Sequence, residues 1–224
     1  YNLDHSIMNK NDKTWNLFKS KKNISGCLLT KEGIIDSEMV SRKLSSQILS
    51  NKNIDVLCNY AVNDKNIEKI KKENDIVINC TYNQPFIGFV NKKIETKHEN
   101  CLIAIMKDPK YSNVGLTIMD GPFCSLYPST RNRFTLSSVI YTPFQKENLF
   151  NYFDLKKQLY KIINHGNDYF RFSENLKLEG YYIGKKTKIK KDINDQRESI
   201  VTREGNMISV FSGKVSAAMS VYKK

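Results

Sequence analysis

Residues 206–214 read Asn206-Met207-Ile208-Ser209-Val210-Phe211-Ser212-Gly213-Lys214, and small residues follow from 215 to 220. A β-branched and aromatic run that stops at Ser-Gly and gives way to helix-compatible residues predicts a strand, a tight turn and the start of a helix. Free backbone N–H groups and the positive end of a helix dipole meet at such a turn, which suits a bound anion. Taken alone, the turn fits a plain strand-to-helix connection equally well.

Length and composition limit the size of the core and the classes of protein to which the chain can belong. The chain has 224 residues, of which 40% are hydrophobic, enough for one large core or two modest ones. No run approaches the roughly 18 apolar residues of a membrane span, and no charged-then-apolar leader opens the chain, so we expect no membrane and a cytoplasmic location. The cysteines show no C-x-x-C pair, and we expect them to be reduced residues of the core. They are Cys27, Cys58, Cys80, Cys101 and Cys124.

The net charge of +13 raises the question of a nucleic-acid partner. Only six of the 36 basic residues are arginine, the side chain expected at base edges and in bidentate phosphate contacts. The lysine runs at 69–72 and 185–191 are more typical of solvated faces. The composition therefore argues against nucleic acid, and a basic polyanion-binding protein stays open as an alternative.

The first third of the chain has an α/β pattern. Asp36 is a plausible N-cap for a helix over 37–50, whose stripe is formed by Val40, Leu44 and Ile48. The run 75–80 is almost continuously β-branched, as in a strand buried on both faces of an α/β sheet, and loops after such strands carry ligands. Further expected elements are a strand and loop over 24–35, a short strand over 54–57 and a polar helical turn over 67–73.

The middle of the chain changes pattern after residue 84. Three strand-like segments separated by turn signals indicate an antiparallel sheet, followed by a helix over 146–164 that ends at the glycine of His165-Gly166. The strand-like segments are 101–106, 115–119 and 134–142. We expect a mixed α/β (α+β) fold in which residues 1–83 and 181–224 form one α/β domain and residues 84–180 an inserted antiparallel domain.

Four segments in this order resemble FAD-dependent oxidoreductases of the D-amino-acid oxidase superfamily. They are residues 28–36 before a helix, 75–81, 195–199 and the turn Ser212-Gly213-Lys214, and the resemblance covers roughly residues 24–222. It implies an FAD-binding α/β domain with an inserted substrate domain. The implied activity is oxidation of a C–N or C–O bond in a small polar substrate, with FAD as the cofactor.

The resemblance also implies site residues. It places the FAD contacts at Thr81, Tyr82, Arg197, Ser212, Gly213 and Lys214. It places the substrate contacts at Arg131, Tyr141 and Arg197. Simpler interpretations remain open, because Arg197 fits a surface ion pair and strand tyrosines usually pack the sheet.

No catalytic acid or base stands out in the sequence. A Ser–His or Cys–His pair would arise only through folding, and no G-x-S-x-G turn is present. The three histidines, His5, His98 and His165, are far apart and share no metal-ligand spacing. We therefore expect no metal site.

The sequence departs from the family in two ways, and these departures leave two functional alternatives open. The family cradles the FAD pyrophosphate on a G-x-G-x-x-G turn, which is absent from these residues, and it more often has Ala-Thr-Gly where this chain has Cys80-Thr81-Tyr82. One alternative is a C-terminal portion that needs a missing N-terminal FAD-binding segment as partner, which the start at Tyr1 favours. The other is a non-catalytic binding module of the same fold that has lost FAD.

Overall fold

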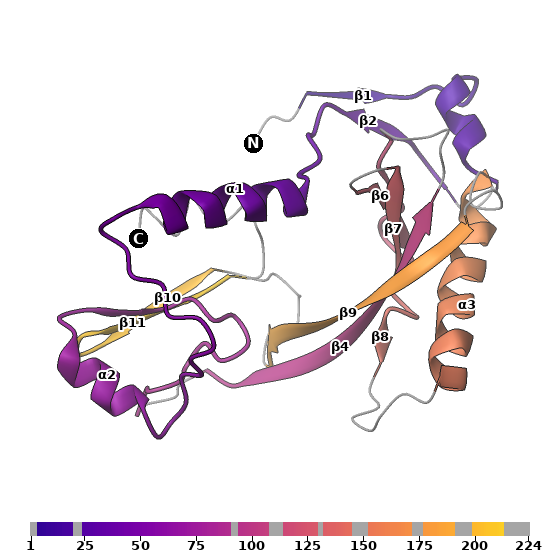
Figure 1. Ribbon diagram of the computed structural model, residues 1–224. Coiled ribbons are helices and arrows are strands. Elements are labelled where there is room, and N and C mark those ends of the chain that lie inside the picture. Colours follow the sequence, from indigo (N-terminus) through magenta and orange to yellow (C-terminus); the bar gives the residue numbers. More distant parts are fainter. Residues whose placement is uncertain are drawn as a thin grey trace. The chain divides into compact units, whose positions relative to one another are not determined.

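A computed structural model describes residues 4–19, 24–90, 94–107, 114–129, 132–144, 152–171, 177–190 and 199–212. Helices and several sheets alternate along the described chain, which confirms the expected mixture of α and β structure (Figure 1). The chain divides into two compact units. Unit 1 contains residues 1–55 and 100–184, and unit 2 contains residues 56–99 and 185–224. The assignment of 1–83 and 181–224 to a flavin-binding domain stays a prediction.

Unit 1 is built on an antiparallel sheet with the strand order β5-β6-β7-β4-β8, and β9 also pairs with β4. The strands are β4 (Thr96–Lys107), β5 (Leu116–Thr117), β6 (Cys124–Pro128), β7 (Arg133–Ser138), β8 (Pro143–Phe144) and β9 (Lys177–Ile189). The ends of β4 and β9 at residues 96–99 and 185–189 belong to unit 2. Every second residue of β7 is buried, so one face of the sheet forms the core. The expected antiparallel sheet is therefore present.

Helix α3 (Tyr152–Tyr169) covers this core face beside β6 and β7 (Figure 1). Its buried residues Leu155, Leu159 and Ile162 recur at one-turn spacing, which puts them on a single helix face. The expected glycine stop is wrong, because the helix continues through Gly166. A Cβ atom at Gly166 would lie 2.9 Å from Cδ2 of Leu136, so this glycine permits close helix–sheet contact instead of ending the helix.

The start of unit 1 adds β1 (His5–Ile7), a 3-10 helix (Lys13–Leu17), β2 (Leu28–Thr30) and α1 (Ser37–Ser50). The α1 prediction and its cap are confirmed, since the Asp36 carboxylate accepts a hydrogen bond from the Met39 N–H at 2.9 Å. None of its side chains is buried, and Leu44 in the predicted stripe is 53% exposed. Local contacts stabilise the helix, namely this cap and an i,i+4 ion pair between Glu38 and Arg42.

Unit 2 contains a three-stranded sheet of order β10-β11-β3 and the short helix α2 (Ile67–Glu73). Its strands are β3 (Val77–Asn79), β10 (Ile200–Glu204) and β11 (Met207–Phe211). The β10–β11 hairpin turns at Gly205, whose φ of 61° suits glycine. The helical turn over 67–73 and the strand that ends at Phe211 were expected, and both are confirmed.

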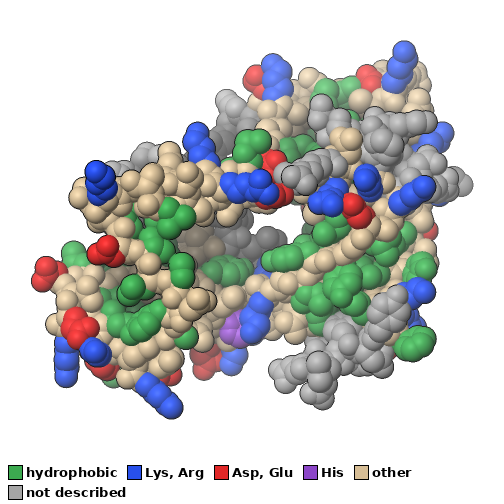
Figure 2. Space-filling view, in the orientation of Figure 1, with side chains coloured by type: hydrophobic (Ala, Val, Ile, Leu, Met, Phe, Trp, Pro, Cys, Tyr) green, Lys and Arg blue, Asp and Glu red, His purple; other side chains and the backbone are tan. Residues whose placement is uncertain are grey.

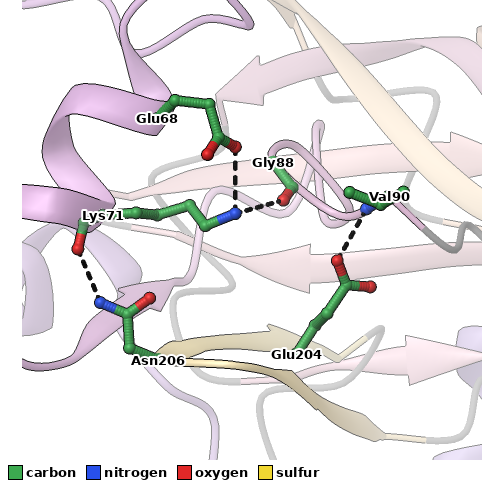
Figure 3. A network of polar contacts seen from close by, with 6 residues as sticks. All are labelled: Glu68, Lys71, Gly88, Val90, Glu204 and Asn206. Atoms are coloured by element: carbon green, nitrogen blue, oxygen red, sulfur yellow. Dashed lines mark hydrogen bonds and ion pairs between the residues drawn. The ribbon is translucent and has the colours of Figure 1, made fainter.

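A small core and a polar network hold unit 2 together. Ile67, Phe86, Phe89 and Met207 form the buried core. Around it, the Asn206 amide donates to the Lys71 carbonyl, while the Lys71 ammonium bonds Glu68 and the Gly88 carbonyl (Figure 3). The same amide also donates to the Asn74 carbonyl. The Glu204 carboxylate accepts the Val90 N–H at 2.9 Å. Side chains thus satisfy backbone groups of the loop and helix beside the sheet.

Three further expectations are wrong. Residues 54–57 form no strand and their side chains are exposed. The strand over 75–80 is shorter than expected and is covered on one face only, because Asn79 is buried while Ile78 is 61% exposed. Cys58 and Cys80 are exposed rather than in the core, although all five cysteines are free as expected.

Residues 185–189 of the lysine run that was expected to be a solvated face lie in β9. Lys188 pairs with Glu99 at 3.0 Å and Lys190 with Glu95 at 3.1 Å, so cross-strand acids neutralise part of this charge. On the face shown in Figure 2, Lys and Arg side chains are scattered among Asp and Glu, without one continuous basic field. Hydrophobic side chains instead gather along β4 and β9 in unit 1 (Figure 2).

Candidate functional site

The candidate site lies in unit 2, at the edge where β3 and β11 end. These two strands are parallel, with Val77 opposite Met207 and Asn79 opposite Ser209. Their carboxyl ends therefore meet at one edge, which brings the predicted residues Thr81 and Tyr82 to the same side as Ser212. In α/β sheets this edge is where ligands usually bind.

Asn79 organises the loop that follows β3. Its buried side-chain oxygen accepts the Thr81 N–H at 3.0 Å and the Thr81 hydroxyl at 2.8 Å. Its amide donates to the carbonyls of Gln84 and Pro85 at 2.9 and 3.1 Å. One asparagine thus uses both ends of its amide to close the loop, a local pattern typical of Asx turns.

Tyr82 has a left-handed backbone, with φ 50°. This conformation usually costs a non-glycine residue about 1–2 kcal/mol. The ring stacks on Phe211 of β11, with ring centroids 5.7 Å apart and an interplanar angle of 10°. The aromatic contact with Phe211 offsets part of this conformational cost.

Sequence reasoning missed the residue that anchors this loop from β9. Thr187, which is 3% exposed, binds the Tyr82 hydroxyl through its backbone N–H and carbonyl, both at 3.3 Å. Its own hydroxyl donates to Asn83 Oδ1 at 3.2 Å and lies 3.1 Å from Nδ1 of His98 on β4. The lysine-rich context of Thr187 carries no local signal for this role.

Ser212 is the last described residue after β11. Its hydroxyl lies 3.0 Å from the hydroxyl of Ser199, which precedes β10. Four predicted site residues lie outside the described part of the chain, namely Arg131, Arg197, Gly213 and Lys214. The predicted helix from Val215 lies outside it as well.

The predicted substrate residue Tyr141 lies in unit 1, between β7 and β8. Its ring makes an edge contact with His165 of α3, at a centroid distance of 5.5 Å, and its N–H donates to the Ser138 hydroxyl at 3.1 Å. Its carbonyl accepts the Gln158 side-chain amide. The observed contacts of Tyr141 are thus with the core of unit 1.

Folding does form a Cys–His–Ser cluster in unit 1. Nδ1 of His165 lies 2.9 Å from the Cys124 sulfur and 2.8 Å from the Ser138 hydroxyl. Burial raises the pKa of the Cys124 thiol to about 12, and Asp168 adds to this effect. Burial also lowers the pKa of His165. The thiol is protonated and fully buried, so the cluster ties α3 to the sheet and is no nucleophile.

Within the described residues, no group of three or more His, Cys, Asp or Glu side chains is placed to hold a metal ion. Among the same residues, no helix has both the length and the apolar character needed to cross a bilayer.

Comparisons with known proteins give only partial matches. No protein-family model matches the chain, and no curated protein matches its sequence. A glycine oxidase from Geobacillus kaustophilus superposes with a TM-score of 0.40 and 9% identity, over 55% of this chain and 31% of the oxidase. An FAD-dependent oxidoreductase from Pseudomonas aeruginosa gives a TM-score of 0.35 and 7% identity, over 55% and 35%. The chain spans about a third of the length of each structure.

Proposed function

We propose that this chain belongs to an FAD-dependent oxidoreductase that oxidises a C–N or C–O bond of a small polar substrate. The observation that carries the proposal is the parallel pairing of β3 with β11, which brings Thr81, Tyr82 and Ser212 to one carboxyl edge. The resemblance of the sequence implies FAD contacts at the same three residues. The left-handed backbone at Tyr82, where the resembled family favours glycine, supports the same assignment.

The residues present fit one part of such a cofactor. The edge offers the side chains of Thr81 and Ser212 beside the stacked pair of Tyr82 and Phe211, which suits the polar rim and flat face of a ring system. The G-x-G-x-x-G turn that would hold the pyrophosphate is not among residues 1–224, so we place that function in a further segment of the natural protein. When bound, FAD would accept the hydride from the substrate, and this edge would orient its ring.

A non-catalytic binding module is the second candidate function. The observation that favours it is the engagement of the Tyr82 ring and hydroxyl, which are held by Phe211 and Thr187 within the protein itself. A side chain fixed in this way fills space that glycine would leave open to a ligand. The polyanion-binding alternative is weakened, since Lys188 and Lys190 already pair with acids.

The deciding experiment is flavin analysis of the natural protein that contains these residues. Absorbance spectra of the purified protein, before and after incubation with FAD and gel filtration, measure the bound flavin. Stoichiometric flavin supports the oxidoreductase, and a colourless protein that takes up none supports the binding module. A screen of amines, amino acids and hydroxy acids for flavin bleaching then tests the substrate class.

A matched pair of glycine variants tests the site itself. Gly213→Val places a branched side chain in the predicted turn and should weaken FAD affinity at least about tenfold, because the backbone there must approach an anion closely. Gly33→Val is the control, since a Cβ atom at Gly33 has no neighbour within 4 Å. Equal FAD affinity of the two variants would show that Gly213 is not part of the cofactor site.

A further inference from the structure

The hydroxyl of Thr187 fixes the tautomer of His98. A threonine hydroxyl has one proton, and here it is donated to Asn83 Oδ1 at 3.2 Å. The 3.1 Å contact between Nδ1 of His98 and the same oxygen therefore requires a proton on Nδ1. The neutral form of His98 that fits this contact is the Nδ1–H tautomer, the minor form of a free neutral imidazole, in which Nε2 carries the lone pair.

The backbone of the same threonine fixes Tyr82. The Thr187 N–H donates to the Tyr82 hydroxyl, and that hydroxyl donates to the Thr187 carbonyl. The hydroxyl thus pairs with the two backbone groups that a neighbouring strand would pair with at an open sheet edge. Two consecutive loop residues, Tyr82 and Asn83, are thereby attached to one residue of β9. The stack on Phe211 gives the loop a third attachment, to β11.

We propose that His98 and Thr187 are positioning residues of the carboxyl-edge site. His98 donates to Thr187, Thr187 donates to Asn83, and the Thr187 backbone holds the Tyr82 hydroxyl, so one conformation of the loop after β3 is selected. Neither residue needs to touch a ligand. The inference deepens the proposed function and rests on it, because a rigid loop matters to flavin binding only where the edge binds flavin.

Three variants separate positioning from bulk packing. Thr187→Val keeps the shape of the side chain and removes the hydroxyl. His98→Leu removes the donor, whereas His98→Asn retains a donor at the position of Nδ1. The positioning role predicts that His98→Asn behaves like the wild type and that the other two variants loosen the attachment of the loop at Asn83.

The first readout needs no flavin. Nitrogen-15 NMR of the wild-type imidazole should show His98 with a protonated Nδ1 and a bare Nε2, and Thr187→Val should return it to the common Nε2–H form. The Asn83 side-chain amide signals should shift in Thr187→Val and in His98→Leu but not in His98→Asn. A wild-type Nε2–H tautomer, or Asn83 signals unmoved in all three variants, would overturn the network.

The second readout is FAD affinity of the natural protein. Thr187→Val and His98→Leu should weaken it by about fivefold to tenfold, the factor expected for one lost hydrogen bond, and His98→Asn should preserve it. If the wild type binds no flavin, the proposed function fails while the NMR result still decides the network. If all variants bind FAD equally while the NMR signals shift, the network exists but positions nothing for the cofactor, and the inference fails.

Discussion

Tyr82 and Phe211 lie face to face across the carboxyl ends of two parallel strands, with their ring planes inclined by 10°. The stack joins a loop residue with a left-handed backbone to the last residue of β11. Aromatic pairs contribute about 0.5–1.5 kcal/mol beyond the area they bury, which is of the order of the backbone cost at Tyr82. A bulky side chain is therefore tolerated at a position whose conformation suits glycine.

The hydroxyl of Tyr82 should contribute measurably to stability. Tyr82→Phe keeps the stack but leaves the buried N–H and carbonyl of Thr187 without this partner, so we expect the free energy of unfolding to fall by about 1–2 kcal/mol. Urea denaturation measures the change. Tyr60→Phe, at an exposed tyrosine of the same unit, is the control and should stay within about 0.5 kcal/mol of the wild type. Equal losses in the two variants would contradict the assignment.

The cysteines should differ sharply in reactivity. Cys58 and Cys80 are exposed, whereas Cys124 is fully buried and has its thiol pKa raised to about 12 by that burial. The thiolate is the reactive form, so a maleimide at neutral pH should label Cys58 and Cys80 within minutes and Cys124 only after unfolding. Peptide mass spectrometry with and without denaturant checks the order. Labelling of Cys124 at the rate of Cys80 would show that α3 does not seal the core.

The stability of unit 1 should depend on pH through His165. Its pKa is lowered mainly by burial, with Asp168 acting in the opposite direction, so the unfolded chain takes up a proton more readily than the folded one. The stabilising contribution is complete above the unfolded pKa of about 6.5 and is lost as the pH falls through the lower folded pKa. For one proton the slope is at most about 1.4 kcal/mol per pH unit.

A neutral His165 is compatible with its hydrogen bonds. An unprotonated Nδ1 can accept the proton of the Ser138 hydroxyl, which itself accepts the Tyr141 N–H. Denaturation between pH 5 and 7.5 should show the slope in the wild type and a flatter line in His165→Asn, which keeps an acceptor that does not titrate. Equal slopes of the free energy of unfolding against pH in the two proteins would exclude His165 as the source of the pH dependence.

The sequence predicted the helices and strands that neighbouring residues alone make recognisable. The cap and stripe of α1 and the β-branched run of β11 need no distant partner to be recognised, and both elements form. β9 was missed because lysines and exposed tyrosines interrupt its apolar alternation, and its partner β4 is about 80 residues away. Thr187 and His98 were missed as parts of the site for the same reason. Their roles arise from pairings between distant segments, which single-residue spacing does not encode.

The close approach of α3 to the sheet should make Gly166 sensitive to a single methyl group. Alanine normally stabilises a helix interior by about 1 kcal/mol relative to glycine. Here the new Cβ would lie 2.9 and 3.0 Å from the two terminal carbons of Leu136, which is fully buried. We expect Gly166→Ala to lower the free energy of unfolding by about 1–3 kcal/mol, since overpacking outweighs the gain in propensity.

A double-mutant cycle tests this contact directly. Leu136→Ala alone should cost about 2–5 kcal/mol through the cavity it creates, and adding Gly166→Ala to that background should be neutral or stabilising, because the space is now free. The coupling free energy should therefore favour the double variant by more than about 1 kcal/mol. Additive losses would mean that α3 shifts as a body to admit the methyl group and that Gly166 does not fix the helix–sheet distance.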